Sequence, residues 1–254
     1  MPELPEVELR RRAIEKSFKT SVLVSIDIYK KGIVKHGDAR VQKRSIGETL
    51  RFVDRRGKYL IFVFPDALEM TLHFGLFGEM AIAGAQEQFP SVCARFVFDN
   101  NRALFLLKWA GIWFGRGVES LKKLGPDPVA EPAEFTLGYL ESSLSKKKTK
   151  VKQFLMDQAI IAGIGAVYAD EILFKSGLLP TRTANDLSKD ETSNLYHATI
   201  KTLKTAIEKT GASGDESRSF LTLEGRETCP VCGTVIVNTK LAGRRTLYCP
   251  SCQH

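Results

Sequence analysis

The first residues after the initiator methionine, Pro2 and Glu3, carry groups that could do covalent chemistry. We expect Met1 to be removed because proline is small, which would leave Pro2 with a free secondary amine. Such an amine can attack the aldehyde carbon of a sugar and form an iminium ion, which eases elimination of a neighbouring phosphate. Glu3 could protonate the sugar ring oxygen and shuttle protons, and Lys58, in the turn RRGKYL, could place a second charge near the leaving base or phosphate. Pro and Glu also suit the first turn of a helix, so a purely structural role stays open.

Four of the five cysteines crowd the end of the chain in two C-x-x-C pairs, with sixteen residues between the pairs. This spacing predicts one tetrahedral Zn(II) site formed by Cys229, Cys232, Cys249 and Cys252. Four thiolates leave no open position, so the metal would be structural. The alternative is a pair of redox sites or disulfides. Cys93 stands alone in a strand-like run and is interpreted as a buried apolar residue.

A second group of residues could bind phosphate. The stretch VKQFLMDQAIIAGIGAVYADEILFKSG predicts two helices joined by a tight turn at Gly163 and Gly165. The N-terminal amides of the second helix, from about Gly165 to Val167, could bind a backbone phosphate. Lysines just upstream could add phosphate contacts, although a lysine run can equally be a solvated face; they are Lys146, Lys147, Lys148, Lys150 and Lys152.

The charge of the whole chain favours the same kind of partner. The formal net charge is +8 and the pI is about 9.2, which fits a polyanionic partner or a merely basic protein. The segment LAGRRTLYC places two arginines on the predicted zinc hairpin, and arginine suits bidentate phosphate recognition. A helix–turn–helix and a zinc ribbon in one basic chain make nucleic-acid binding the favoured interpretation.

The elements that must position these residues fall into two regions. Short runs rich in Val, Ile and Phe, separated by turn residues, predict an antiparallel sandwich or barrel after an opening helix. The segment GPDPVAEPAE is typical of a linker, and the period beyond it becomes helical; the loop GASGDESRS (211–219) then leads to the zinc ribbon. No run is apolar enough to cross a bilayer and no signal peptide is evident, so we expect an intracellular protein, in the cytoplasm or nucleoid of a bacterium.

Five motifs, in order along nearly the whole chain, resemble the formamidopyrimidine-DNA glycosylase and endonuclease VIII family. They are MPELPEVE, RRGKYL (55–60), LGPDP (124–128), DQAIIAGIGAVYADE (157–171) and the C-terminal C-x2-C…GRxTxYCPxCQ (229–253). The resemblance implies an α+β multidomain protein: a catalytic antiparallel β-sandwich begun by a helix (1–124), a linker (125–135), a helix-two-turn-helix domain (136–224) and a four-cysteine zinc-finger β-hairpin (225–254).

The same resemblance implies a function and assigns roles. Members excise damaged bases from double-stranded DNA and then cleave the strand through a Schiff base. Carried over, Pro2 is the nucleophile, Glu3 the proton shuttle, Lys58 a general acid or phosphate contact, and Arg244 the phosphate clamp of the zinc finger. Gly165 and Lys152 join the DNA-binding set. We expect a monomer with one structural Zn(II).

The chain departs from the family pattern where the lesion is held. The family turn usually ends in asparagine, and here Ala166 replaces it, which could cost on the order of 1–3 kcal/mol of DNA binding. The residues that fill the hole left by a flipped base also differ. Leu76 and Phe77 fit the last two places of the Gln-Leu-Tyr wedge of the endonuclease VIII branch, with Gly75 at the first.

The void-filling arginine of the oxidised-purine enzymes has no clear counterpart in LKWAGIWFGRG, where Arg116 comes too late. Trp109 or Trp113 could help support the opened stack, but tryptophans in such a run are more often in the core or against a sheet. The loop GASGDESRSFLTLEG is shorter than a lesion-capping loop of those enzymes.

Two hypotheses follow for the function. The first is a bifunctional DNA glycosylase and abasic-site lyase acting on oxidised bases, by β- or β,δ-elimination. The second is a protein that binds damaged or abasic DNA with lyase activity alone or little turnover; Ala166 and the missing arginine favour it, and the retained Pro2 and Glu3 oppose it.

Overall fold

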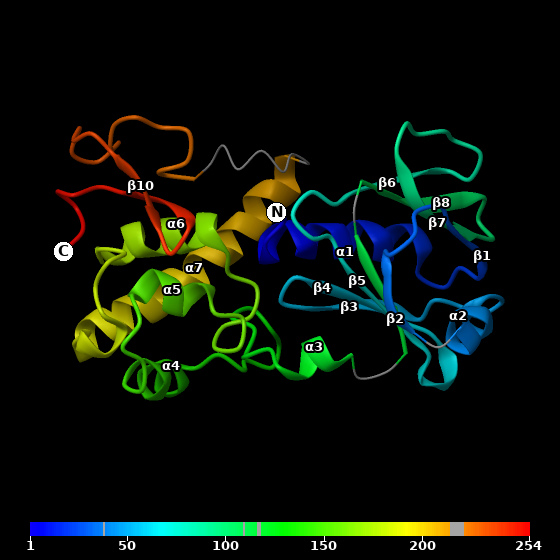
Figure 1. The fold of residues 1–254 in the computed structure, drawn as a ribbon, viewed down its shortest axis with the longest axis horizontal. Helices are drawn as coiled ribbons and strands as arrows, with labels where there is room; N and C mark the ends of the chain where they lie inside the picture. The colour runs from blue at the N-terminus through cyan, green and yellow to red at the C-terminus, as the bar shows by residue number, and fades with distance from the viewer. Residues whose placement is uncertain (38, 109, 116–117, 214–220) are drawn as a thin grey trace. The chain divides into compact units, whose positions relative to one another are not determined.

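The computed structural model describes residues 1–254 apart from 38, 109, 116–117 and 214–220 (Figure 1). The described residues form two compact units. The first unit contains Met1–Pro2 and Glu6–Lys122, and the second contains Glu3–Pro5 and Lys123–His254. None of the helices described is long and apolar enough to span a membrane.

The first unit consists of two β-sheets and the helix α1 (Leu4–Phe18), whose residues from Glu6 onward belong to it. One sheet has the order β1 (Leu23–Ile28), β7 (Val92–Phe98), β8 (Arg102–Leu107) and β6 (Glu79–Gly84). The other has the order β2 (Val34–Gly37), β9 (Gly111–Phe114), β5 (Glu69–His73), β4 (Tyr59–Val63) and β3 (Phe52–Arg56). Two short helices, α2 (Ala39–Ser45) and α3 (Glu119–Lys122), complete the unit.

One hydrophobic cluster contains buried residues from both sheets and from α1, so the sheets share a core as in a sandwich. The helix contributes Val7, Ile14 and Phe18, whose spacing places them on one face of α1. Phe18 stacks on Phe98 of β7 with ring centroids 4.2 Å apart. The opposite face of α1 is therefore available for polar contacts.

The predicted antiparallel pairing holds for seven of the eight strand pairs that the structure describes, and β2 pairs with β9 in parallel. These two strands are far apart in sequence, so no hairpin turn fixes their relative direction. The β9 strand also decides between the two interpretations of Trp113 in LKWAGIWFGRG, because Gly111–Phe114 belongs to a sheet. Trp113 lies in this strand with its ring 5.9 Å from that of Tyr59, and so faces the sheet.

Among its described residues the second unit contains four α-helices, one 3-10 helix (Ala184–Asp186) and the zinc hairpin. The α-helices are α4 (Leu137–Leu144), α5 (Val151–Met156), α6 (Ala166–Ser176) and α7 (Lys189–Ser213); the hairpin strands are β10 (Val237–Leu241) and β11 (Arg244–Tyr248). α7 reaches Ser213, so the loop predicted from residue 211 begins in a helix, and its residues 214–220 lie outside the described part of the chain.

The helix predicted over VKQFLMDQAII is shorter in the structure and ends at Met156. The reason is local, because the Asp157 carboxylate accepts a hydrogen bond from Ala159 N at 3.0 Å and competes with continuation of the helix. The segment predicted as a linker also differs from a free tether. Gly125 N donates to Gln158 O at 2.9 Å, and Ala162 N donates to Pro126 O at 3.0 Å, within the second unit.

Candidate functional site

Glu3 lies in the second unit with its carboxylate at the N-terminus of α6. Its side chain is buried, with 3% of the residue exposed. Oε2 accepts hydrogen bonds from Gly165 N at 2.5 Å and from Tyr168 N at 3.4 Å, and Oε1 accepts one from Val167 N at 3.2 Å. These groups are the unpaired donors of a helix start, where the macrodipole also favours a negative charge. The structure thus fixes the orientation of a carboxylate that directly follows Pro2.

This arrangement corrects one prediction. Gly165 N was expected to face a DNA phosphate, but it donates to the Glu3 carboxylate instead. A Cβ built on Gly165 would lie 2.4 Å from Glu3 Cδ and 2.5 and 2.7 Å from its two oxygens, so a side chain here would displace the carboxylate. Ala166 is the first residue of α6 and is half-buried, and its methyl group offers no hydrogen bond.

The turn before α6 holds the next residue of the chain. Leu4 N donates to Gly163 O at 3.0 Å, and a Cβ on Gly163 would lie 2.6 Å from Leu4 Cδ1. Gly163 also has φ +96°, which favours glycine. The side chain of Gln158 shapes this turn: its Oε1 accepts from Gly163 N at 2.9 Å and its Nε2 donates to Ile164 O at 2.7 Å. Sequence reasoning missed Gln158, because an amide that bonds only to backbone has no spacing signature.

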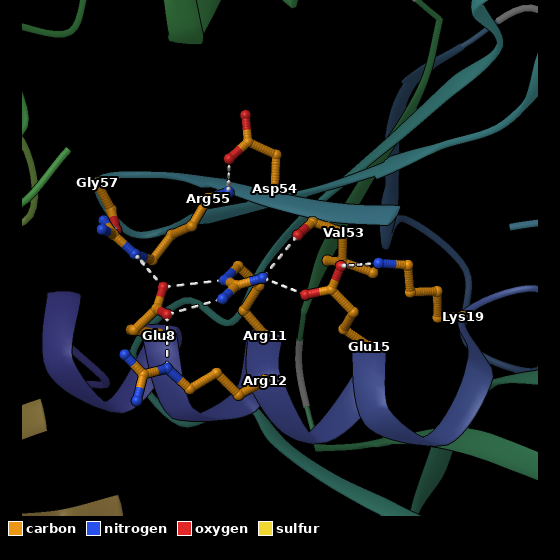
Figure 2. A network of polar contacts seen from close by, with 9 residues as sticks. All are labelled: Glu8, Arg11, Arg12, Glu15, Lys19, Val53, Asp54, Arg55 and Gly57. Atoms are coloured by element: carbon orange, nitrogen blue, oxygen red, sulfur yellow. Dashed lines mark hydrogen bonds and ion pairs between the residues drawn. The ribbon is translucent and has the colours of Figure 1, made fainter. Parts of the chain in front are cut away.

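Lys58 lies in the first unit, in the two-residue turn between β3 and β4. Lys58 is buried, so its side chain has a more defined position than that of a solvated surface lysine. Arg55 braces the turn: its Nε donates to Glu8 Oε2 at 3.0 Å and its Nη1 donates to Gly57 O at 3.2 Å. Figure 2 shows how Glu8, on α1, reaches Arg55 on the strand.

Glu8 is the centre of a wider ion-pair network on the polar face of α1 (Figure 2). Besides Arg55, it accepts hydrogen bonds from both Arg11 and Arg12, at 2.8 to 3.0 Å. Burial alone would raise the pKa of Glu8, but the hydrogen bonds from Arg11 and Arg12 and the charges of Arg11 and Arg55 lower it to about 2. Arg11 also donates to Val53 O at 3.1 Å, which ties α1 to β3.

His73 ends β5 and is a second residue that sequence reasoning missed. Its Nδ1 accepts a hydrogen bond from Gly75 N at 3.0 Å, and its ring lies 4.6 Å from that of Tyr59. Burial first, and the charge of Lys58 second, lower the pKa of His73 to about 4. The imidazole is therefore neutral at pH 7, and the Nδ1 acceptor leaves its proton on Nε2 as a donor.

The turn that follows β5 exposes the two predicted wedge residues. Leu76 is 54% exposed and Phe77 is 73% exposed, while Phe74 at the start of the turn is buried. Gly78 N donates to Phe74 O at 2.8 Å and closes the turn. Two large apolar side chains are thus presented to solvent on a short, closed turn. Trp109 and Arg116, which were considered for a related role, lie outside the described residues.

The four C-terminal cysteines converge as predicted. Their sulfur atoms all lie within 4.8 Å of one another, with Cys229 Sγ and Cys252 Sγ 3.8 Å apart and Cys232 Sγ and Cys249 Sγ 3.4 Å apart. Zn–S bonds of about 2.3 Å in a tetrahedron place the sulfurs about 3.8 Å apart. The donor set and its spacing therefore fit one structural Zn(II) and leave no position for a substrate.

Arg244 is exposed at the start of β11, after the two-residue turn Ala242–Gly243 of the zinc hairpin. Both turn residues have positive φ, +49° and +72°, as a tight hairpin of this kind requires. Its neighbour Arg245 is engaged internally, because its Nη2 lies 2.9 Å from Glu224 Oε2. Arg244 is thus exposed beside the hairpin turn, and its role as a phosphate clamp stays a prediction.

Lys152 does not have the exposed position expected of a phosphate contact, since only 1% of it is accessible. Its Nζ lies 2.7 Å from Asp170 Oδ1 and donates to Arg245 O at 2.6 Å and Thr246 Oγ1 at 2.9 Å. Asp170 in turn accepts from Leu247 N at 2.9 Å. The pair joins the zinc hairpin to α5 and α6, and the predicted phosphate contact of Lys152 is wrong because its ammonium group is buried in this pair.

Comparison with known proteins agrees with this geometry along the whole chain. The formamidopyrimidine-DNA glycosylase N-terminal domain matches residues 1–108, the H2TH domain of the same glycosylase matches 124–217, and the zinc finger found in FPG and IleRS matches 226–254. The formamidopyrimidine-DNA glycosylase of Lactiplantibacillus plantarum is 33% identical over 273 residues, covering 98% of each chain. That of Lactobacillus johnsonii is 34% identical over 283 residues, covering 100% of this chain and 99% of the relative.

Solved structures of formamidopyrimidine-DNA glycosylases are also similar to this chain over nearly its full length. Formamidopyrimidine-DNA glycosylase of Lactococcus lactis, non-covalently bound to DNA containing an abasic site, has a TM-score of 0.89 at 30% identity, over 99% of both chains. A complex of the Lactococcus lactis protein with DNA containing N7-benzyl-Fapy-dG has a TM-score of 0.91 at 29% identity, also over 99% of both chains. The chain, with its four-cysteine zinc finger, belongs to the formamidopyrimidine-DNA glycosylase family.

Proposed function

We propose that this chain is a bifunctional DNA glycosylase and abasic-site lyase that excises oxidised bases from double-stranded DNA. The observation that carries the proposal is the Glu3 carboxylate, which is held by three backbone amides of α6 and directly follows Pro2. The names of the relatives point to formamidopyrimidines as the first lesions to test.

In the proposed mechanism, the Pro2 amine attacks C1′ of the damaged nucleotide and the bond from C1′ to the base breaks. The base leaves with a proton, and Pro2 is then bonded to C1′ of the still closed sugar. Glu3 protonates the ring oxygen O4′, the C1′–O4′ bond breaks, and the opened sugar is joined to Pro2 as an iminium ion. Loss of a proton from C2′ then expels the 3′-phosphate and cleaves the strand. Glu3 supplies the group that moves protons at the sugar, and its three amide partners keep it from rotating away.

The remaining residues hold the DNA in this proposal. Lys58 contributes a positive charge near the reacting nucleotide, and Arg244 on the zinc hairpin binds a backbone phosphate. Leu76 and Phe77 enter the base stack where the damaged base leaves it. Their exposed apolar side chains are then covered by the neighbouring bases, which removes apolar surface from water. The metal, when bound by its four cysteines, braces the hairpin that presents Arg244.

A second candidate function is favoured by one observation. Ala166 begins α6 with a methyl group where an asparagine could have bound phosphate. A chain that binds abasic or damaged DNA and turns over slowly would also fit this change. The two candidates differ in whether an intact damaged base is excised: the second would form a covalent adduct with the abasic duplex alone, or with no duplex.

Borohydride trapping tests the proposal directly. The full chain, without Met1 and loaded with zinc, is incubated with duplexes that carry a formamidopyrimidine, 8-oxoguanine, thymine glycol, dihydrouracil or an abasic site. We expect a covalent adduct with at least one lesion and with the abasic duplex. Failure to trap with every duplex, together with tight binding, would favour the second candidate. A Pro2→Gly variant that traps as well as the wild type would show that another amine is the nucleophile.

A further inference from the structure

Arg10 is a buried cation on α1 that no step of the proposed mechanism uses. Only 7% of the residue is exposed, although its neighbours Arg11 and Arg12 belong to the partly solvated network around Glu8. Successive residues of a helix point about 100° apart, so Arg10 leaves α1 in a different direction from that network. A buried arginine is costly unless its charge is used.

The guanidinium of Arg10 contacts both ends of the turn that carries the wedge residues. Its Cζ lies 4.2 Å from the centroid of the Phe74 ring, in the geometry of a cation–π contact. Its Nη1 donates to Gly78 O at 3.1 Å in a buried hydrogen bond. Phe74 and Gly78 are the two residues whose backbone hydrogen bond closes the turn.

This pairing needs an arginine. A planar guanidinium can stack on a ring and donate in its own plane at the same time, whereas the ammonium of lysine is a point charge without a flat face. Leu76 and Phe77 lie at the tip of the turn, and most of their surface is exposed. Packing therefore restrains them less than it restrains Phe74. The stiffness of the tip therefore depends on how its two ends are held.

We propose that Arg10 is a positioning residue for the Leu76–Phe77 turn, and that it sets the efficiency with which the pair enters the base stack. The inference rests on the proposed function of these two residues as a wedge. Base opening precedes excision from an intact lesion, whereas an abasic site has no base to open. A fault in the wedge should therefore slow excision and spare strand cleavage at a preformed abasic site.

The test compares Arg10→Met and Arg10→Lys with Lys16→Met, a control that removes an exposed charge from the same helix. We expect Arg10→Met to slow single-turnover excision about tenfold, in line with the loss of a charge-assisted hydrogen bond, with abasic cleavage within about twofold of wild type. Fluorescence of 2-aminopurine beside the lesion should rise less on binding. Arg10→Lys should fall in between, and Lys16→Met should match the wild type.

Amide exchange at Gly78 separates this inference from the function on which it rests. Gly78 N–H is bonded to Phe74 O, so losing Arg10 should speed its exchange in the free protein even if no lesion is excised. Unchanged exchange in both Arg10 variants would overturn the inference while leaving the glycosylase proposal intact. Equal losses in excision and abasic cleavage would also overturn it, since they indicate a general structural role. Absence of trapping by the wild type would instead count against the proposed function.

Discussion

A single methyl group added at Gly165 should disable the proposed proton shuttle. A Cβ there would lie 2.4 Å from Glu3 Cδ, against about 3.4 Å for an ordinary contact, so the carboxylate must move by about 1 Å. Gly165 has φ −123° and ψ −162°, an extended conformation that alanine adopts without strain. The perturbation is therefore confined to the position of Glu3.

The size of the effect follows from the bonds that the displacement breaks. The Glu3 carboxylate accepts from three amides at 2.5, 3.2 and 3.4 Å, and a shift of this size removes the shortest of them and distorts the others. A hydrogen bond to a charged group contributes about 1.5–3 kcal/mol, and a well-placed proton-transfer group contributes about 10²–10⁴ in rate. We expect Gly165→Ala to slow base excision about a hundredfold, at the lower end of that range.

Single-turnover excision and borohydride trapping measure this loss, and urea denaturation reports the accompanying change in stability. Gly138→Ala is the matched control, because it adds the same methyl group in α4 of the same unit with nothing within 4 Å. Gly138→Ala should excise at the wild-type rate. If Gly165→Ala also excised within about twofold of the wild type, the carboxylate position would not matter for the chemistry and the reasoning from Glu3 would be refuted.

Three further predictions concern charge and metal. The pKa of Glu8 is lowered from 4.5 to about 2, so the ionised Glu8 stabilises the fold by about 3 kcal/mol above pH 4.5, and this stabilisation is lost as the pH falls through 2. Glu8→Gln should remove this stabilisation, so the free energy of unfolding measured in urea should change less between pH 4.5 and pH 2 than in the wild type. The ring of His73 should titrate near pH 4 by NMR, and Lys58→Met should raise that pKa without restoring 6.5, because burial is the larger cause. Arg244→Ala should weaken binding to all duplexes and lower the slope of log K against log salt concentration by about 1. Chelation of zinc should abolish DNA binding while the helical circular-dichroism signal is largely kept.

The features that sequence predicted well are those whose partners lie close in the chain or repeat with a regular period. The zinc ligands are two tight knuckles on one hairpin, so the spacing of Cys229, Cys232, Cys249 and Cys252 already implied their convergence. The strands β4, β5, β7 and β8 appear in the sequence as apolar runs between turn residues. Leu76 and Phe77 were assigned only from the family's wedge, and the structure exposes both on a short turn.

The features that could not be predicted from the sequence depend on a partner that lies far away in the chain. Nothing local distinguishes Lys152 from the exposed lysines before it, and its burial follows from Asp170 one helix away. The amide of Gly165 looked like a phosphate site because the anion that occupies it, Glu3, is 162 residues distant. The strands β2 and β9 have only 4 residues each, too few to show a strand period, and their parallel pairing has no signature in either segment.

The distance between Glu3 and its amide partners has a consequence for the order in which the protein matures. Residues 3–5 are made among the first, but they belong to a compact unit whose other residues begin at 123. During synthesis the residues of the sandwich can fold before α6 has been made, but residues 3–5 cannot form their contacts until α6 has left the ribosome. The Glu3 carboxylate therefore reaches its position late, after the chain has passed residue 168. A truncated or stalled chain would carry Glu3 without the three amides that hold it, so under the proposed function an incomplete product would not cleave DNA.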